Sequence, residues 1–421
     1  MMKKALLFIG IPAVLLVLCG ALWWQWATTI PEIDIPAAPR PPSPNAYDFY
    51  VKASRAIYPS KPPPGARQSE DLVPREMRIA ATPLARKEAW LARNAKALDL
   101  LRQGFQYPCR VPTNRQGQVK GQYTENLRIR ALAEVVQVEI RVNRKRGRAL
   151  PSAQSALDLL KLGHDLAHGG TSLSQTFSVS INAMGRYELW LILPQLKKTE
   201  LDTVTKRFHE IARQREPLSE IIREDNYSTL AMLKNGLPQQ RAFDWEISWR
   251  LPRQLYRRLK KPLRLEFENT MRLTKAFQEF ATQPYPNKLD LSLLPNDYSS
   301  QLGIENFENT RLTHTRDETG TALLHMALAL ENYRFKHGHY PTTIGELVPQ
   351  ELPEVPNDPF KPERRLTYKK SGTEYVLYSV GPDGRDDGGK VIDNQKLNDP
   401  WLAKYRAIKQ SQGDFVLGKN Y

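Results

Sequence analysis

Cysteine is scarce in this sequence, with two residues in 421. A disulfide framework of the kind that holds small secreted domains together is therefore excluded, and a packed core must stabilise the chain. Acidic residues are also in the minority, because 45 Asp and Glu face 61 Lys and Arg, for a formal net charge of +16. With 41% hydrophobic and 25% charged residues, the composition is that of a folded protein and excludes disorder for most of the chain.

One long stretch near the start, Ala5–Ala27, lacks charge altogether. As a helix it would span about 34 Å, against roughly 30 Å for the hydrocarbon core of a bilayer. The sequence therefore predicts a transmembrane helix in residues 1–30 that contacts the bilayer through residues 5–27. Two lysines precede the stretch and two acidic residues follow it, which predicts a cytoplasmic N-terminus and an inner-membrane protein whose bulk is periplasmic. A cleaved signal peptide is the alternative.

Proline and glycine divide the remaining chain into segments. Residues 31–44 are rich in proline and predict an extended linker. Residues 45–283 contain amphipathic, helix-length segments separated by short breakers, which predicts an all-α domain built as an irregular bundle. Residues 284–318 show weak periodicity and read as a connector, and residues 319–421 as a smaller α+β module with a C-terminal tail. The fold class expected from these patterns is mainly α.

The C-terminal module begins with a predicted helix at Thr321–His337, which Gly338 ends. Two segments rich in Tyr, Val and Leu follow at Leu366–Lys370 and Glu374–Val380, on either side of Ser371-Gly372. Such a pattern is typical of a β-hairpin. The module is therefore expected to combine one helix with a small antiparallel sheet.

The stretches NYRFKHGHYP, NDPF and EYVLYSVGPDGRDDGG together resemble the globular domain of the major pseudopilins of type II secretion, the G-type family. The resemblance covers residues 321–394. It implies an α+β fold, a calcium ion in the acidic loop after the last strand, and a role in secretion or pilus-like assembly beside other envelope proteins. The helical remainder resembles uncharacterised membrane-anchored helical envelope proteins, which brings no activity with it.

The acidic loop of the module contains the candidate calcium ligands. Ca²⁺ prefers six to eight oxygen ligands, which a loop with clustered carboxylates and several glycines can supply. The alternative is a solvated turn rich in Asp and Gly. The candidate ligands are Asp383 and Asp393, which match the family pattern, together with Asp386 and Asp387.

A second candidate site is the basic segment Arg250–Arg264, in which cationic and apolar residues alternate. As an amphipathic helix it could bind an anionic lipid surface or an anionic envelope polymer. A solvated cationic face is the alternative, and no nucleic acid is expected on the predicted side of the membrane. The candidate anion-binding residues are Arg253, Arg257, Arg258, Lys260, Lys261 and Arg264.

His164 and His168 are four residues apart, the spacing at which two imidazoles on one helix face reach a single Zn²⁺. Zinc proteases of this type need Glu where Asp165 stands, because the longer side chain reaches the metal-bound water. Ser172 lies in GTSLS, which lacks the second glycine of a nucleophile elbow and instead favours a helix cap. A helix-end role is the alternative for both histidines.

No catalytic residues and no organic cofactor are assigned, and the sequence indicates a protein that is not an enzyme. The predicted function is that of a membrane-anchored extracytoplasmic structural or interaction protein, linked to type II secretion or pilus-like assembly. The alternatives are a binding module for an anionic lipid or envelope polymer, and a zinc hydrolase.

Overall fold

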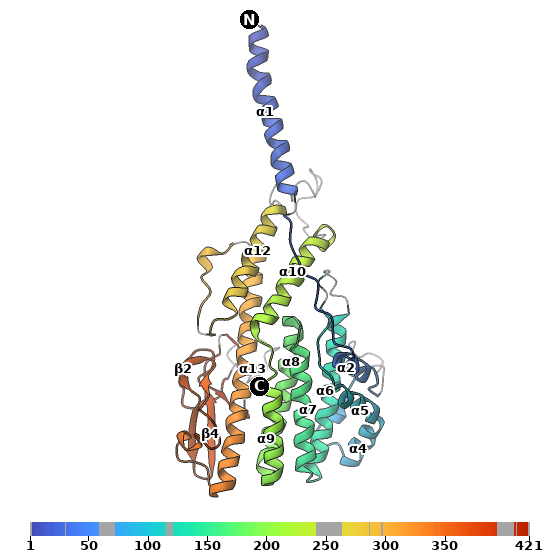
Figure 1. Ribbon diagram of the computed structural model, residues 1–421, viewed down its shortest axis with the longest axis vertical. Coiled ribbons are helices and arrows are strands. Elements are labelled where there is room, and N and C mark those ends of the chain that lie inside the picture. Colours follow the sequence, from blue (N-terminus) through green and yellow to red (C-terminus); the bar gives the residue numbers. More distant parts are fainter. Residues whose placement is uncertain are drawn as a thin grey trace.

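The computed structural model describes residues 2–29, 31–58, 72–113, 115, 121–240, 263–285, 287–295, 298–393, 408–409 and 411–419. Within them the protein is a long helical body, with helix α1 (Met2–Thr28) projecting from one end and a small β region on one side at the other end (Figure 1).

Helix α1 occupies the segment for which the sequence predicts a membrane span. Among the described residues, however, no helix combines the length and the apolar character that crossing a bilayer requires. The predicted transmembrane helix is therefore wrong, as are the single-pass topology and the inner-membrane location.

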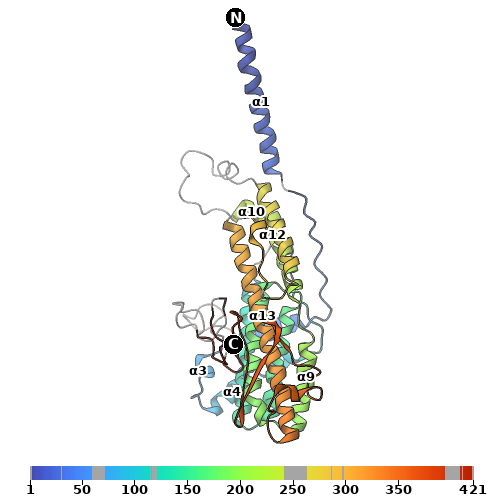
Figure 2. The ribbon, with the colours of Figure 1, turned by 90° about the vertical axis from the view of Figure 1, so that its left-hand side faces the viewer.

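The proline-rich linker does not stand away from the body. It is extended over residues 31–42 and runs down the side of the helices (Figure 2). Ile33 packs against Leu233 and Phe267 in a small apolar cluster. Arg115 Nη1 donates hydrogen bonds to the carbonyl oxygens of Pro36 and Ala37, at 2.9 and 3.0 Å. These contacts attach the linker to the body.

Four short helices follow, namely α2 (Ala46–Arg55), α3 (Arg75–Arg78), α4 (Leu84–Arg93) and α5 (Ala95–Gly104). The sequence pattern predicts one helix over residues 83–105, whereas the structure has two that meet at Asn94. The buried Asn94 side chain donates to the Trp90 carbonyl oxygen at 3.0 Å and accepts a hydrogen bond from the Tyr58 backbone N–H at 2.9 Å. The break thus depends on a partner distant in sequence.

The core of the body is formed by α6 (Gln122–Lys145), α7 (Ala149–Ala167) and α8 (Ser172–Ile192). Helix α7 is buried on nearly every side, and its closest neighbour is α8. Glycines allow that approach, since a Cβ at Gly185 would lie 2.9 Å from the Ala156 carbonyl oxygen. Leucine, valine and alanine fill the remaining space in this core, whose burial is the main stabilising term.

The later helices are α9 (Lys198–Ala212), α10 (Leu218–Gln240), α12 (Leu263–Phe280) and α13 (Tyr298–His337). Residues 298–318, for which the sequence predicts part of an irregular connector, belong to α13. The side chain of Arg311 explains the continuity, because it is 1% exposed, lies 4.5 Å from the Phe280 ring centroid and donates to the Pro284 carbonyl oxygen at 2.9 Å. Tertiary contacts therefore stabilise a helix with little apolar periodicity.

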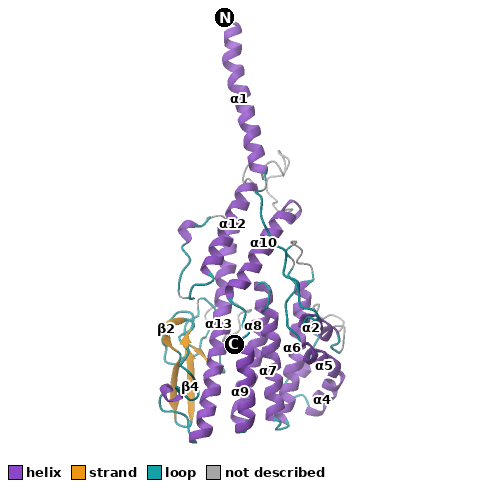
Figure 3. Cartoon of the chain, viewed as in Figure 1, coloured by secondary structure: helices purple, strands orange, loops and turns teal. Residues whose placement is uncertain are grey.

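The strands lie against the C-terminal half of α13 (Figure 3). A two-stranded sheet pairs β1 (Asn357–Asp358) with β2 (Lys361–Arg365), and an antiparallel three-stranded sheet has the order β3 (Thr367–Ser371), β4 (Glu374–Ser379), β5 (Phe415–Val416). Ser371 faces Glu374 in the β3–β4 register, which confirms the predicted hairpin. Strand β5 returns the end of the chain to the body, where Gly418 packs against Trp190 of α8.

Candidate functional site

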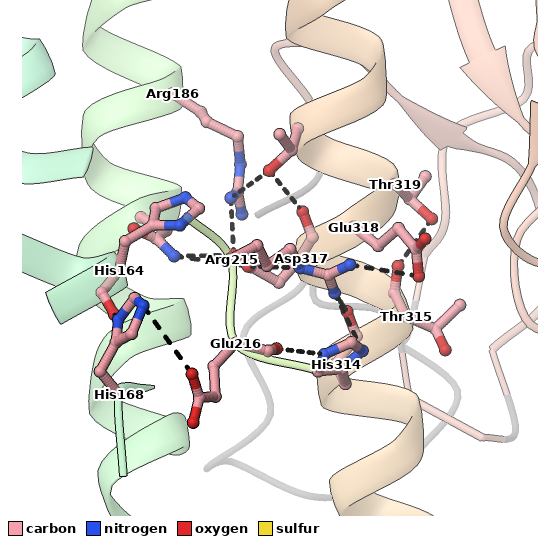
Figure 4. Close-up of polar contacts among 12 residues, drawn as sticks. His164, His168, Arg186, Arg215, Glu216, His314, Thr315, Asp317, Glu318 and Thr319 are labelled. Carbon is pink, nitrogen blue, oxygen red and sulfur yellow. Dashed lines mark hydrogen bonds and ion pairs between the residues drawn. The ribbon is translucent and has the colours of Figure 1, made fainter. Parts of the chain in front are cut away.

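The two histidines of the predicted zinc site lie at the end of α7 in different surroundings (Figure 4). His164 is 3% exposed and lies near the charge of Asp317. His168 Nδ1 is 2.8 Å from the His164 carbonyl oxygen, and its Nε2 is 3.8 Å from a carboxylate oxygen of Glu216. Among the described residues, no group of three or more His, Cys, Asp or Glu side chains is placed to hold a metal ion. This geometry does not favour the zinc hydrolase.

Asp317, on α13, is the centre of a buried network of charged side chains (Figure 4). Arg186 Nη1, from α8, donates to its Oδ1 at 2.6 Å, and Asn182 Nδ2 donates to the same oxygen at 3.2 Å. Arg215, in the segment between α9 and α10, places Nε 3.8 Å from Oδ2. Burial alone would raise the pKa of Asp317, but the two guanidinium charges hold it well below its usual range. The carboxylate is therefore charged inside the protein.

The geometry around Arg215 fixes the protonation state of His314. Arg215 Nη2 lies 2.9 Å from His314 Nδ1 and donates to the His314 carbonyl oxygen at 2.7 Å. A guanidinium N–H can only donate, so Nδ1 accepts, and the ring proton lies on Nε2, which is 3.2 Å from the Glu216 carbonyl oxygen. Burial, together with the charge of Arg215, lowers the pKa of His314 to about 3. Burial likewise lowers the pKa of His164 to about 4, so both imidazoles are neutral at pH 7.

Two glycines make room for this network. A Cβ at Gly320 of α13 would lie 2.6 Å from Arg186 Nε, and a Cβ at Gly163 of α7 would lie 2.0 Å from Asn182 Oδ1. Because real Cβ contacts are longer than this, any larger residue would displace the polar side chain. The sequence thus combines small residues on two helices with long polar residues on a third.

A cleft of about 660 Å³ opens along another face of α8. Three small side chains at helical spacing, Thr176, Ser180 and Ala183, leave space between α6 on one side and α13 on the other. The volume falls within the roughly 300–1,000 Å³ that small-molecule sites occupy. The residues that line the cleft are Arg130, Gln137 and Arg141 of α6; Thr176, Phe177, Val179, Ser180, Ala183, Met184 and Tyr187 of α8; and Thr313 and Arg316 of α13.

Helices α6 and α8 run in the same direction, because Gln122 contacts Ser174 and, further along both helices, Gln137 contacts Glu188. Arg130 lies about two turns beyond Gln122, and so at the level of Asn182, about two turns beyond Ser174. On the other wall, Arg316 precedes Asp317, whose carboxylate contacts Asn182. Arg130 and Arg316 are therefore on opposite walls of the cleft at a similar level, with Ser180 and Ala183 on the floor between them.

The charge of the cleft is positive. Three arginines line it, and none of its described lining residues is acidic. Arg141 has an acidic partner outside the lining, because its Nε lies 2.8 Å from Oε1 of the fully buried Glu188. Arg144 also contacts Glu188, at 2.9 Å. Arg130, in contrast, has no hydrogen bond or ion pair with another described residue. Arg316 is 7% exposed, so its charge acts in a medium that screens it less than bulk water.

The basic segment that the sequence indicates for anion binding falls mostly on residues that the structure does not describe. Arg253, Arg257, Arg258, Lys260 and Lys261 lie outside the described residues. Arg264 is at the start of α12, where its Nε lies 2.9 Å from Glu268 Oε1 and its guanidinium lies 5.7 Å from the Trp26 ring centroid. Binding of anions by this segment stays a prediction.

Hydrogen bonds to aspartate carboxylates fix the acidic loop that follows β4. Asp386 accepts from Arg364 and from the Tyr378 hydroxyl, both at 2.9 Å. The backbone N–H of Asp387 donates to the buried Asp414 at 3.3 Å, and Asp383 accepts from the Arg385 backbone N–H at 3.1 Å. Asp393 is exposed at the end of the described part of the loop. The calcium site stays a prediction, and the loop owes its described shape to these hydrogen bonds.

Sequence reasoning did not find the cleft, because its walls come from segments far apart in the chain. The signal that could have indicated it is the spacing of Thr176, Ser180 and Ala183, which places small side chains on one stripe of the helix. The spacing of Arg130 and Arg141 similarly places both cations on one face of α6. Neither pattern says which helices would form the walls.

Comparison of the chain with known protein families, with curated proteins and with solved structures finds no match. The resemblance of residues 321–394 to pseudopilins therefore stays a prediction. The arrangement of the described side chains is what remains to indicate a function.

Proposed function

We propose that this chain is a binding protein for an anionic ligand, which it holds in the cleft between α6, α8 and α13. The observation that carries the proposal is the lining of that cleft, which includes three arginines and, among its described residues, no acidic side chain. The sequence suggested the same class of ligand, although for a different segment. A role in secretion or pilus-like assembly stays a prediction.

The side chains suit an oxyanion such as phosphate, sulfate or carboxylate. A guanidinium presents N–H donors in a planar fork that matches two oxygens of such a group, and charge-assisted hydrogen bonds are about twice as strong as neutral ones. The hydroxyls of Thr176, Ser180 and Thr313 line the same cleft and add neutral donors. With Arg130 and Arg316 on opposite walls, one oxyanion can be contacted from both sides.

The buried network supports the walls. Asp317 ties α13 to Asn182 and Arg186 of α8, and each of these residues is adjacent in sequence to one that lines the cleft, namely Arg316, Ala183 and Tyr187. The ligand therefore meets a cleft whose walls are already in place, which reduces the entropic cost of binding.

The proposal is tested by isothermal titration of the full chain with inorganic phosphate at low ionic strength. We expect Arg130→Ala to weaken binding about tenfold, since a hydrogen bond to a charged group contributes roughly 1.5–3 kcal/mol and solvent screens part of it at this exposed position. Affinity should also fall as salt is raised, because an exposed charge is screened.

Arg128 offers a matched control, since it belongs to the same helix but does not line the cleft. Arg128→Ala removes an equal charge and should leave the affinity within about twofold. Equal losses in the two variants would show that only the net charge matters. That result, or an absence of phosphate binding by the unmodified chain, would overturn the proposal.

A further inference from the structure

The cleft is far larger than a bare oxyanion requires. A water molecule takes about 30 Å³ of liquid volume, so 660 Å³ corresponds to the space of roughly twenty waters. A phosphate between Arg130 and Arg316 would leave most of this space unfilled. The residues that line the unfilled space therefore indicate the chemistry of the rest of the ligand.

The rest of the lining is largely apolar. Ala183 and Met184 follow Ser180 by about one turn of α8, and the ring of Tyr187 follows one turn later. Phe177 and Val179 also line the cleft. From Ser180 to Tyr187 the floor extends for about 10 Å along the helix. At this end the remaining cation, Arg141, already contacts Glu188 at 2.8 Å, so it is less available to a second anionic group than Arg130 is.

We infer that the ligand is an amphiphile with one oxyanionic head and an apolar body. The inference rests on the proposed function and deepens it by naming the class of ligand. The head lies between Arg130 and Arg316 near the hydroxyl of Ser180, and the body lies along Ala183, Met184 and Tyr187 toward the C-terminal end of α8. Monoesters of phosphate with an alkyl chain have this chemistry.

A series of n-alkyl phosphates from one to eight carbons, kept monomeric by low concentration, tests the inference by titration calorimetry. Each methylene that leaves water for the apolar floor should lower Kd about fourfold, the equivalent of about 0.8 kcal/mol. The gain should stop once the chain exceeds the floor. Met184→Ala should reduce the gain per methylene, which is measured within that variant as the ratio of the Kd values of successive alkyl phosphates.

The outcomes separate this inference from the function on which it rests. Phosphate binding that depends on Arg130, with no gain from the alkyl chain, would overturn the amphiphile and retain the anion site. Loss of the alkyl gain in Met184→Ala, in a variant whose thermal unfolding matches the unmodified chain, supports it. A chain-length gain that is unchanged in both Met184→Ala and the cleft-filling Ala183→Leu would also overturn it, since the alkyl group would then bind elsewhere.

A second arm identifies the source of the head group. Vesicles of phosphatidic acid in phosphatidylcholine present the same phosphate monoester at a lipid surface. Co-sedimentation that Arg130→Ala abolishes indicates a lipid as the source. Binding of monomeric alkyl phosphate without co-sedimentation supports the inference with a soluble amphiphile as the source.

Discussion

The buried network and the cleft lie on neighbouring faces of the same helix, but the arginines of the network are paired with a buried carboxylate, whereas Arg130 of the cleft is not paired with one among the described residues. In the network, Arg186 and Arg215 meet the carboxylate of Asp317. In the cleft, Arg130 has no described acidic partner. A buried cation must be paired because desolvation costs several kcal/mol, whereas a cation at an open cleft keeps its water until a ligand replaces it. The paired charges of the network are structural, whereas Arg130 is the cation that the proposed ligand would contact.

The largest effect is expected from Asp317→Asn. It preserves shape but leaves Arg186 and Arg215 without their buried counter-charge, which should lower the free energy of unfolding by about 3–5 kcal/mol. Urea denaturation followed by circular dichroism measures this. Glu318→Gln is the neighbouring control, because its carboxylate pairs with Arg215 while 49% exposed, and it should cost less than about 1 kcal/mol. Similar small losses in both variants would contradict a buried, charged Asp317.

The second-largest effect is expected from acidification, which should lower the free energy of unfolding through the histidines of the network. The pKa values of His164 and His314, about 4 and about 3 in the folded protein, lie below the unfolded value of about 6.5. Between these values the unfolded chain binds more protons, so stability is complete above pH 6.5 and falls as the pH falls. At pH 5 each histidine should cost about 2 kcal/mol relative to pH 7. The carboxylate of Asp317, whose folded pKa is lowered, loses its contribution only at still lower pH.

This pH dependence is checked by urea denaturation at pH 7, 6 and 5 of the unmodified chain and of two variants. His164→Gln should reduce the decline, because it removes one of the histidines whose pKa burial lowers. His339→Gln replaces an exposed histidine and should leave the decline unchanged. Parallel curves for all three proteins would contradict neutral, buried imidazoles in the network.

Gly163→Ala should have a smaller effect, again on stability. The added Cβ would lie 2.0 Å from Asn182 Oδ1 and displace a donor of Asp317, at a cost of about 1–3 kcal/mol for an overpacked site. Gly303→Ala in α13 is the matched control. Its Cβ would meet nothing closer than 3.9 Å, so it should raise stability by up to about 1 kcal/mol through helix propensity. Equal changes in melting temperature would show that Asn182 has room to move.

The smallest change in stability is expected for Arg130→Ala, within about 0.5 kcal/mol, because an exposed side chain without a described partner contributes little. The same variant should lose about tenfold in phosphate affinity, as proposed above. A large loss of stability would show that Arg130 belongs to the structural set of charges, and the contrast between the two faces of α8 would disappear.

Local patterns predicted local structure well. The hairpin around Ser371-Gly372 follows from residues adjacent in the chain. The helix ends are also local, because glycine and proline determine them. The break at Asn94 depends on Tyr58. The helical state of residues 298–318 depends on the contacts of the buried Arg311 with Phe280 and Pro284. None of these partners is visible in a local window. The apolar run at the N-terminus predicted a membrane-spanning helix. A helix, α1, does lie there, but no helix among the described residues has both the length and the apolar character to cross a bilayer.

The candidate site was less predictable than the fold. His164 was singled out by its spacing to His168, but its surroundings are set by Asp317, which is far away in the sequence. The density of positive charge predicted an anion site in residues 250–264. The described cleft is instead lined by arginines that are far apart in the sequence, on α6 and α13. A site assembled from three helices has no signature in any one of them, since only their packing brings Arg130 and Arg316 to opposite walls.

The length of α13 has a consequence for dissecting the molecule. Its 40 residues contribute to successive apolar clusters, through Phe307 beside α12, Leu328 in the main core and Leu330 beneath the sheet. Cutting the gene at the boundary suggested by the C-terminal resemblance would divide one continuous rod. The excised fragment would expose the face that packs on α8, and the truncated body would lose Leu324, Ala327 and Leu328 from its core. The two halves should therefore unfold as a single cooperative unit.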